Sequence, residues 1–141
     1  MGYWRQVGCG AAAVVVAAAF VPVAANEAAE KVCQDEQNNG AINACLGKVY
    51  GDLDKELNAT YKAGFKYIDA AALQPSLARD WRRAYQDAQR KWIAYREADC
   101  GPPVSYEWTG GSATGGMQLG CKIARTRERL AALKRRYGKG E

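Results

Sequence analysis

The residues of this chain best suited to chemistry are its cysteines. The sequence holds five cysteines and no histidine in 141 residues. Without histidine, Ser-His-Asp and Cys-His catalysis and every His-ligated metal site are excluded. The thiols can form disulfides in an oxidising compartment, or they can bind zinc as thiolates. The cellular compartment and the cysteine spacing decide between these two uses.

The N-terminal segment predicts export. Arg5 provides a basic start, residues 11–21 form an apolar run, and small residues follow at 23–25. The run is shorter than the roughly 20 residues that a membrane-spanning helix needs. We therefore predict a signal peptide over residues 1–25, cleaved before Asn26, and one helical domain over residues 26–141. The exported domain would be periplasmic or secreted, and an uncleaved N-terminal anchor is the alternative.

Cleavage would remove Cys9 and leave an even number of cysteines in an exported chain, which predicts two disulfides. The remaining four are Cys33, Cys45, Cys100 and Cys121. A zinc site made of four thiolates usually contains two C-x2-C pairs, whereas the spacings here are 12, 55 and 21 residues. We expect no metal and no cofactor.

Hydrophobic spacing predicts an all-α fold with three helices and no strand. Apolar residues recur at steps of three and four in each of the three segments. The first helix should cover residues 39–68. The second should begin at Pro75 and run to about Asp99. The glycine-rich segment 104–120 is expected to be a loop, and the third helix to begin near Met117 or Cys121 and to end at Tyr137.

This helix order constrains the cysteines. A short turn joins the first two helices, so they should form an antiparallel hairpin with the third helix packed against it. All four cysteines then collect at one end of a small bundle. Four cysteines allow three connectivities. We favour Cys33–Cys45 and Cys100–Cys121, because each bond would close a local loop.

Polar residues recur at helical spacing inside the first two helices. Asp54 and Asn58 are four residues apart, and Gln89 and Arg96 are seven apart. We interpret these four residues as a hydrogen-bond and ion-pair network between helices, since buried charges need partners. The alternative is that Asp54 and Arg96 bind a ligand. No catalytic constellation stands out, so the chain is not expected to be an enzyme.

Three ordered motifs carry a family resemblance. They are Y-x3-D-x2-L-N-x2-Y from Tyr50, A-Q-R-x-W-I-x-[YF]-R-x-A-x-C from Ala88, and C-x4-T-x2-R-x3-L from Cys121, with Gly-Gly-Ser at 110–112. Over residues 33–133 the chain resembles the LprI-like lysozyme-inhibitor N-terminal domain family of exported bacterial proteins. The resemblance implies an all-helical, disulfide-bonded domain outside the cytoplasm. It also implies inhibition of lysozyme.

The segment between Cys100 and Cys121 supplies the candidate contact residues. Tyr106, Trp108 and Ser112 lie on it, and exposed aromatic side chains make efficient anchors. The leading hypothesis is a non-catalytic binding protein that occludes the cleft of lysozyme or another cell-wall hydrolase with residues 101–120. The alternative is a flexible connector with no partner.

The charge distribution suggests a second hypothesis. The chain has a formal net charge of +5, and residues 121–141 hold eight basic and two acidic residues. This C-terminal helix could bind anionic lipid or cell-wall polymer, which would make the protein an envelope-binding module. A nucleic-acid partner is not expected for an exported chain, nor is a membrane span after processing. Because lysozymes are typically basic, this helix is not the expected contact surface for them.

Overall fold

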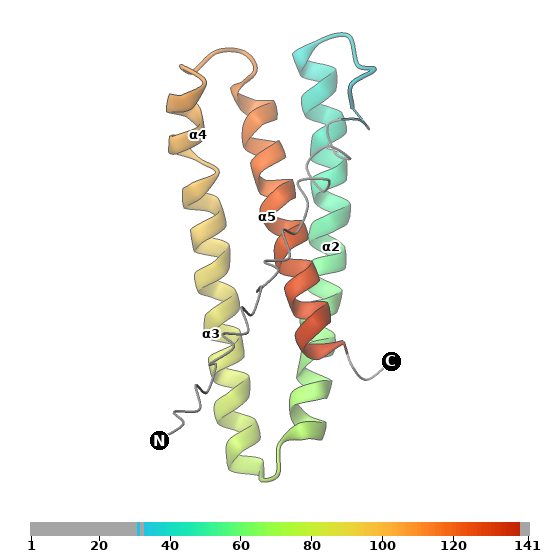
Figure 1. The fold of residues 1–141 in the computed structure, drawn as a ribbon, viewed down its shortest axis with the longest axis vertical. Helices are drawn as coiled ribbons and strands as arrows, with labels where there is room; N and C mark the ends of the chain where they lie inside the picture. Colours follow the sequence, from blue (N-terminus) through green and yellow to red (C-terminus); the bar gives the residue numbers. More distant parts are fainter. Residues whose placement is uncertain (1–30, 32, 139–141) are drawn as a thin grey trace, which may run out of the picture.

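The computed structural model describes residue 31 and residues 33–138, which form helices and no strand. The helices are α2 (Asn39–Ala71), α3 (Pro75–Asp99), α4 (Pro102–Glu107) and α5 (Thr114–Tyr137). Figure 1 shows α2, α3 and α5 side by side along the bundle, with short α4 standing at the end where α2 and α5 begin. The predicted all-α fold, a helical hairpin with a third helix, is confirmed. The predicted signal peptide lies outside the described residues.

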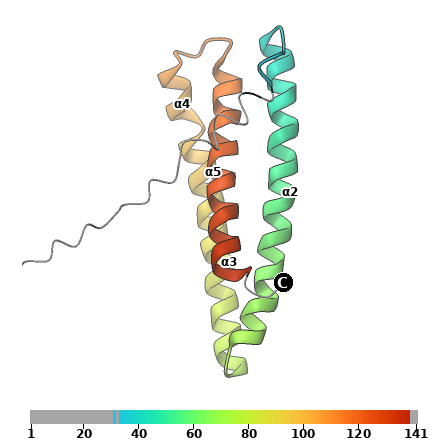
Figure 2. The same ribbon diagram turned by 45° about the vertical axis from the view of Figure 1, so that its right-hand side comes forward.

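The order of packing differs from a simple hairpin. α2 and α5 run in the same direction and make the most extensive helix contact, while α3 runs antiparallel to both. Figure 2 shows α5 beside α2 over its length. Glycines allow this approach at the start of α5, because a Cβ atom at Gly115 or Gly116 would lie 3.0 Å from the Asn43 amide. The third helix is therefore packed mainly against the first helix.

Local signals account for the helix ends. The Asn38 side chain accepts a hydrogen bond from the Ala41 backbone N–H at 3.0 Å, which caps α2. Pro75 occupies the first turn of α3, where no backbone N–H is required. The last turn of α5 holds Lys134, Arg135 and Arg136, which complement the negative end of the helix dipole.

The buried core consists of two clusters of residues at different positions along the bundle. Its larger cluster of buried residues contains Leu57, Ile68, Tyr85, Leu130, Leu133 and Tyr137. A smaller cluster near the start of α2 contains Cys33, Leu46 and Ile123. The buried residues of α3 are Tyr85, Gln89 and Arg96, so this helix contributes polar and aromatic groups in place of aliphatic ones. The bundle consequently depends on hydrogen bonds where α3 meets its neighbours.

The expected loop over 104–120 is wrong. Residues 102–107 form α4, and α5 begins at Thr114, which leaves only residues 108–113 as the connection. Pro102 and Pro103 lie in the first turn of α4, where proline is tolerated. Gly115 and Gly116 remain helical because their packing on α2 offsets their low helix propensity. The first helix also continues three residues beyond the predicted Ile68.

Both disulfides lie at the end of the bundle that carries α4. The sulfurs of Cys33 and Cys45 are 2.01 Å apart, and those of Cys100 and Cys121 are 1.97 Å apart. The structure thus has the pairing that the sequence favoured. In the described part of the chain, no helix combines the length and the apolar character needed to cross a membrane.

Candidate functional site

The disulfide-bonded end of the bundle carries a projecting segment, residues 101–113, which we call the tip. Two large aromatic side chains are exposed on it: Tyr106 at 83% and Trp108 at 45% of full accessibility. Val104, between them and the bundle, is buried. Figure 1 shows that α4 stands at the extreme end of the molecule. The tip therefore presents aromatic surface that none of the other described helices covers.

Covalent and polar contacts hold the tip in place. The Cys100–Cys121 disulfide joins the residue before the tip to α5. Gln118 of α5 donates hydrogen bonds to the carbonyl oxygen of Gly101 at 3.1 Å and to Ser105 Oγ at 2.9 Å. At the other side, Asn39 Nδ2 of α2 donates to Ser112 Oγ at 3.0 Å. Of the three candidate contact residues, Ser112 thus fixes the tip to α2, Tyr106 is almost fully exposed, and Trp108 is about half-exposed.

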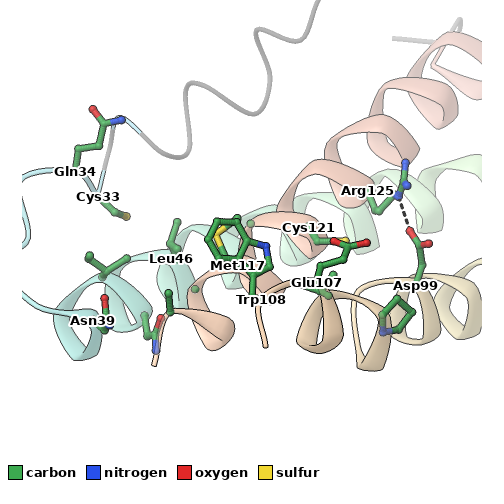
Figure 3. Close-up of a pocket in the computed structure, with 17 residues that line it drawn as sticks. Cys33, Gln34, Asn39, Leu46, Asp99, Glu107, Trp108, Met117, Cys121 and Arg125 are labelled. Carbon is green, nitrogen blue, oxygen red and sulfur yellow. Dashed lines mark hydrogen bonds and ion pairs between the residues drawn. The ribbon is translucent and has the colours of Figure 1, made fainter. Parts of the chain in front are cut away.

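A cavity of about 610 Å³ lies beneath the tip (Figure 3). Its apolar lining comes from α2, α4 and α5 and includes Ile42, Leu46, Val104, Trp108 and Met117. The ion pair between Asp99 and Arg125, at 2.9 Å, lies at one side of the cavity. The hydrogen bond to Asp99 raises the pKa of Arg125 above its usual value. The cavity combines an apolar floor with a fixed ion pair.

One group of potential metal ligands occurs among the described residues. The ligand atoms of Asp99, Cys100 and Cys121 lie within 4.8 Å of one another. The two sulfurs are bonded to each other, so neither is available as a thiolate. This cluster is therefore a disulfide beside an ion-paired carboxylate.

The predicted polar network divides into two parts. Arg96 is only 5% exposed, and its Nη1 donates to Asp54 Oδ1 and to Thr126 Oγ1, each at 3.1 Å. Asn58 Nδ2 donates to Asp54 Oδ2 at 3.0 Å, so three of the four predicted residues come together. Gln89 lies apart from them and accepts a hydrogen bond from Arg129 Nε at 3.0 Å.

Trp92 connects the two parts of this network. Its ring lies 4.9 Å from the Arg96 guanidinium and 5.7 Å from that of Arg129. Sequence reasoning did not include Thr126 or Arg129 among the network residues. Thr126 is spaced three residues after Ile123 and four before Leu130, which is the buried face of α5. This spacing alone predicts that the Thr126 hydroxyl is buried.

Charge is separated along the bundle. Residues 33–47 and 101–121 contain the exposed acids Asp35, Glu36 and Glu107 and no lysine or arginine. The basic residues of α5 begin beyond this region, and several are paired with acids of α2 and α3: Lys122 with Glu97, Arg125 with Asp99, and Lys134 with Glu56. The hydrogen bond from Lys122 lowers the pKa of Glu97. The tip therefore lies in the acidic part of the molecule.

The fold and the site together define a disulfide-bonded three-helix bundle with an aromatic tip. The sequence model of the family described as Lysozyme inhibitor LprI matches residues 29–133, and the chain belongs to this family. An uncharacterized protein of Rhizobium meliloti (strain 1021) is 32% identical over 114 residues, covering 74% of this chain and 78% of the relative. No solved structure matches the chain significantly.

The motif residues that carry this membership lie mainly in the interior. Asp54, Gln89, Arg96, Thr126 and Arg129 all belong to the motifs and take part in the interhelical contacts, and Asn58 holds Asp54 from within α2. They hold α2, α3 and α5 together. The motif Gly-Gly-Ser at 110–112 instead lies on the exposed tip. The family pattern thus describes mostly the bundle, and a partner must be recognised by surface residues.

Proposed function

We propose that this protein is an exported, non-catalytic inhibitor of lysozyme or of a related cell-wall hydrolase. The tip would enter the substrate cleft of the enzyme and exclude the polysaccharide. Membership of the lysozyme inhibitor family supports the class of partner. Two disulfides support a location outside the cytoplasm. The observation that carries the mechanism is the exposure of Tyr106 and Trp108 on a segment held at both sides.

The fixed tip favours tight binding for an entropic reason. A segment that is already ordered loses little conformational freedom when it binds. Tyrosine and tryptophan bury large areas with only two side-chain torsions each, and they dominate the energetics of many interfaces. Gln118 and Ser112 hold the two sides of the tip, so the aromatic rings are presented on a rigid support.

The charge of the tip also suits a basic enzyme. Asp35, Glu36 and Glu107 are exposed near it. Lys122 and Arg125, the first basic residues of α5, are paired with Glu97 and Asp99, and the other basic residues of α5 lie farther along the helix. Opposite charge at the contact surface steers the approach of the partners and raises the association rate. The electrostatic objection raised by the basic C-terminal helix therefore does not apply to a contact made by the tip. The envelope-binding hypothesis for that helix stays a prediction, and no contact described above favours it.

Titration of the oxidised protein into lysozyme tests the proposal. Activity should be followed in parallel with bacterial cell walls and with a small soluble oligosaccharide substrate. We expect stoichiometric inhibition of both reactions, because cleft occlusion does not depend on the size of the substrate. Inhibition of wall lysis alone would mean that the protein coats the wall, and this would contradict the proposal. The absence of any inhibition at roughly 10–100 μM, where even weak specific complexes form, would also contradict it.

A further inference from the structure

A second cavity, of about 210 Å³, lies between α3 and α5 in the half of the bundle away from the tip. We call it the α3–α5 groove. Its walls include the aromatic residues Trp81, Tyr85 and Tyr137 and the guanidinium-bearing residues Arg129 and Arg136. Alanines on both helices leave the space open, and no acidic residue of the described part of the chain lines it. The groove therefore combines two positive charges with aromatic surface.

Arg129 is half-buried in this groove without an acidic partner. Its Nε donates to Gln89 Oε1 at 3.0 Å, and its guanidinium lies over Trp92. Among the described residues, no carboxylate forms an ion pair with it, whereas Arg96 pairs with Asp54 and Arg125 with Asp99. Burial, together with the positive charge of Arg136, lowers the pKa of Arg129. A partly buried charge without a counter-charge is unfavourable, so a bound anion would stabilise this region.

Hydrogen-bond donors exceed acceptors around Arg129. Gln89 is 4% exposed, and its oxygen accepts from Arg129, while its Nε2 has no hydrogen-bond partner among residues 33–138. The hydroxyl of Tyr85 donates to the carbonyl oxygen of Tyr61, so it does not satisfy these groups. Gln89 does not line the groove, so an oxygen-rich anion bound there would accept hydrogen bonds from Arg129 and Arg136. Guanidinium groups bind carboxylate and phosphate oxygens in pairs, with two parallel N–H···O bonds.

We propose that the α3–α5 groove binds an oxyanion, a phosphate or carboxylate group, between Arg129 and Arg136. The volume suits such a head group, since sites for whole drug-sized ligands have roughly 300–1,000 Å³. The rings of Trp81 and Tyr137 would contact the apolar or ring-shaped body that carries the anion. The groove is distant from the tip, so this site does not depend on the proposed inhibition of lysozyme.

Calorimetric titration of the full chain with inorganic phosphate and with glucose 1-phosphate, at low salt, tests the site. Arg136→Gln is the main variant because this side chain is exposed, so its loss should leave the bundle folded. Arg129→Gln is the second, with circular dichroism to verify folding. Arg135→Gln is the matched control, since Arg135 neighbours Arg136 on α5 but does not line the groove.

We expect saturable binding that weakens about tenfold in Arg136→Gln and at least as much in Arg129→Gln, while Arg135→Gln keeps the wild-type affinity. An equal loss in Arg135→Gln would overturn the proposal, because it would show only general attraction to a basic helix. No binding up to about 50 mM of either ligand would also overturn it.

Vesicles distinguish two sources of the same anion. Phosphatidylglycerol vesicles, compared with phosphatidylcholine vesicles, test whether the phosphate belongs to a lipid headgroup. Binding that is lost in Arg136→Gln and kept in Arg135→Gln would support the groove and assign the anion to lipid. Binding of the soluble phosphates alone, with the same dependence on Arg136, would support the groove and assign a soluble ligand. Vesicle binding that both variants weaken equally would contradict a discrete site.

Discussion

The hydroxyl end of Tyr85 on α3 lies directly over Gly64 on α2. A Cβ atom at Gly64 would overlap the Tyr85 hydroxyl and would lie 2.9 Å from the ring carbon Cζ. Tyr85 cannot move away easily, because it is 4% exposed and its hydroxyl donates to the Tyr61 carbonyl oxygen at 3.2 Å. Its ring also lies 4.7 Å from that of Tyr137. Gly64 thus allows the two arms of the hairpin to pack closely at Tyr85.

This contact predicts opposite effects for two glycine substitutions in α2. Gly64→Ala should lower the free energy of unfolding by about 1–3 kcal/mol, because the methyl group overpacks the Tyr85 site. Gly51→Ala is the matched control, since nothing lies within 4 Å of a Cβ atom there. It should raise stability by up to about 1 kcal/mol through helix propensity. Urea denaturation of both variants measures the difference.

Introducing Gly64→Ala into a Tyr85→Phe variant tests whether the loss of stability is caused by the steric overlap with Tyr85. In Tyr85→Phe, the atom nearest to the new methyl group is absent, so Gly64→Ala should be less harmful than in the wild type. If Gly64→Ala and Gly51→Ala change stability equally, the close approach of Tyr85 has no energetic effect and the packing described above is wrong.

Arg96 should be essential for the fold. Arg96→Met keeps much of the side-chain volume but leaves Asp54 and Thr126 without their shared donor. Removing one partner of a buried ion pair typically costs about 3–5 kcal/mol, and the partial exposure of Asp54 places our expectation at the lower end. Arg90→Met on the exposed face of α3 should change stability by less than about 0.5 kcal/mol. Similar urea midpoints for the two variants would contradict the role given to Arg96.

The sequence predicted the three long helices and the disulfide pairing because these features depend on local patterns. Apolar spacing defined α2 and α3, and the order of the cysteines along a hairpin favoured one pairing. α4 and the start of α5 were missed because Pro102, Gly115 and Gly116 usually interrupt helices. The helical conformation of Gly115 and Gly116 depends on packing against Asn43 and the neighbouring residues of α2, which local sequence patterns do not include.

In the candidate site, too, some contacts follow from local sequence patterns and others depend on tertiary packing. Asp54, Asn58 and Arg96 come together because helical spacing and the hairpin determine their positions. Gln89 pairs with Arg129 instead, because α5 packs against α3 at this position. The exposed aromatic pair on the tip could be proposed from sequence, but its fixation by Gln118 could not, since it depends on the folded position of α4.

High pH should destabilise the bundle through Tyr85. Burial raises the pKa of Tyr85 to about 12, so the native state requires its neutral phenol. The unfolded chain releases this proton near the ordinary tyrosine pKa of about 10. The neutral Tyr85 phenol therefore makes its full contribution to the free energy of unfolding below pH 10. This contribution is lost as pH rises from about 10 towards 12. Urea midpoints measured between pH 8 and 11 should fall less steeply in Tyr85→Phe than in the wild type. Parallel slopes would show that another group is responsible.

The Cys100–Cys121 disulfide should matter for both stability and inhibition. Replacing both cysteines by serine should cost about 3 kcal/mol, because the bond closes a segment with a sequence separation of 21 residues. It should also weaken inhibition, since the tip loses its covalent link to α5. Replacing Cys33 and Cys45 should lower stability too, but it leaves that link intact and should affect inhibition less. Equal inhibition by the two double variants would contradict the need for a fixed tip.

The most direct measurement of the central claim compares inhibition by two double variants at opposite ends of the bundle. Tyr106→Ala with Trp108→Ala removes the exposed aromatic residues of the tip. Leu73→Ala with Leu77→Ala removes exposed apolar residues near the turn between α2 and α3. With a soluble oligosaccharide substrate, the tip variant should inhibit lysozyme at least about thirtyfold more weakly than the wild type, as expected for the loss of interface anchors. The turn variant should inhibit as the wild type does. Equal inhibition by the tip variant and the wild type would show that the tip does not occupy the cleft.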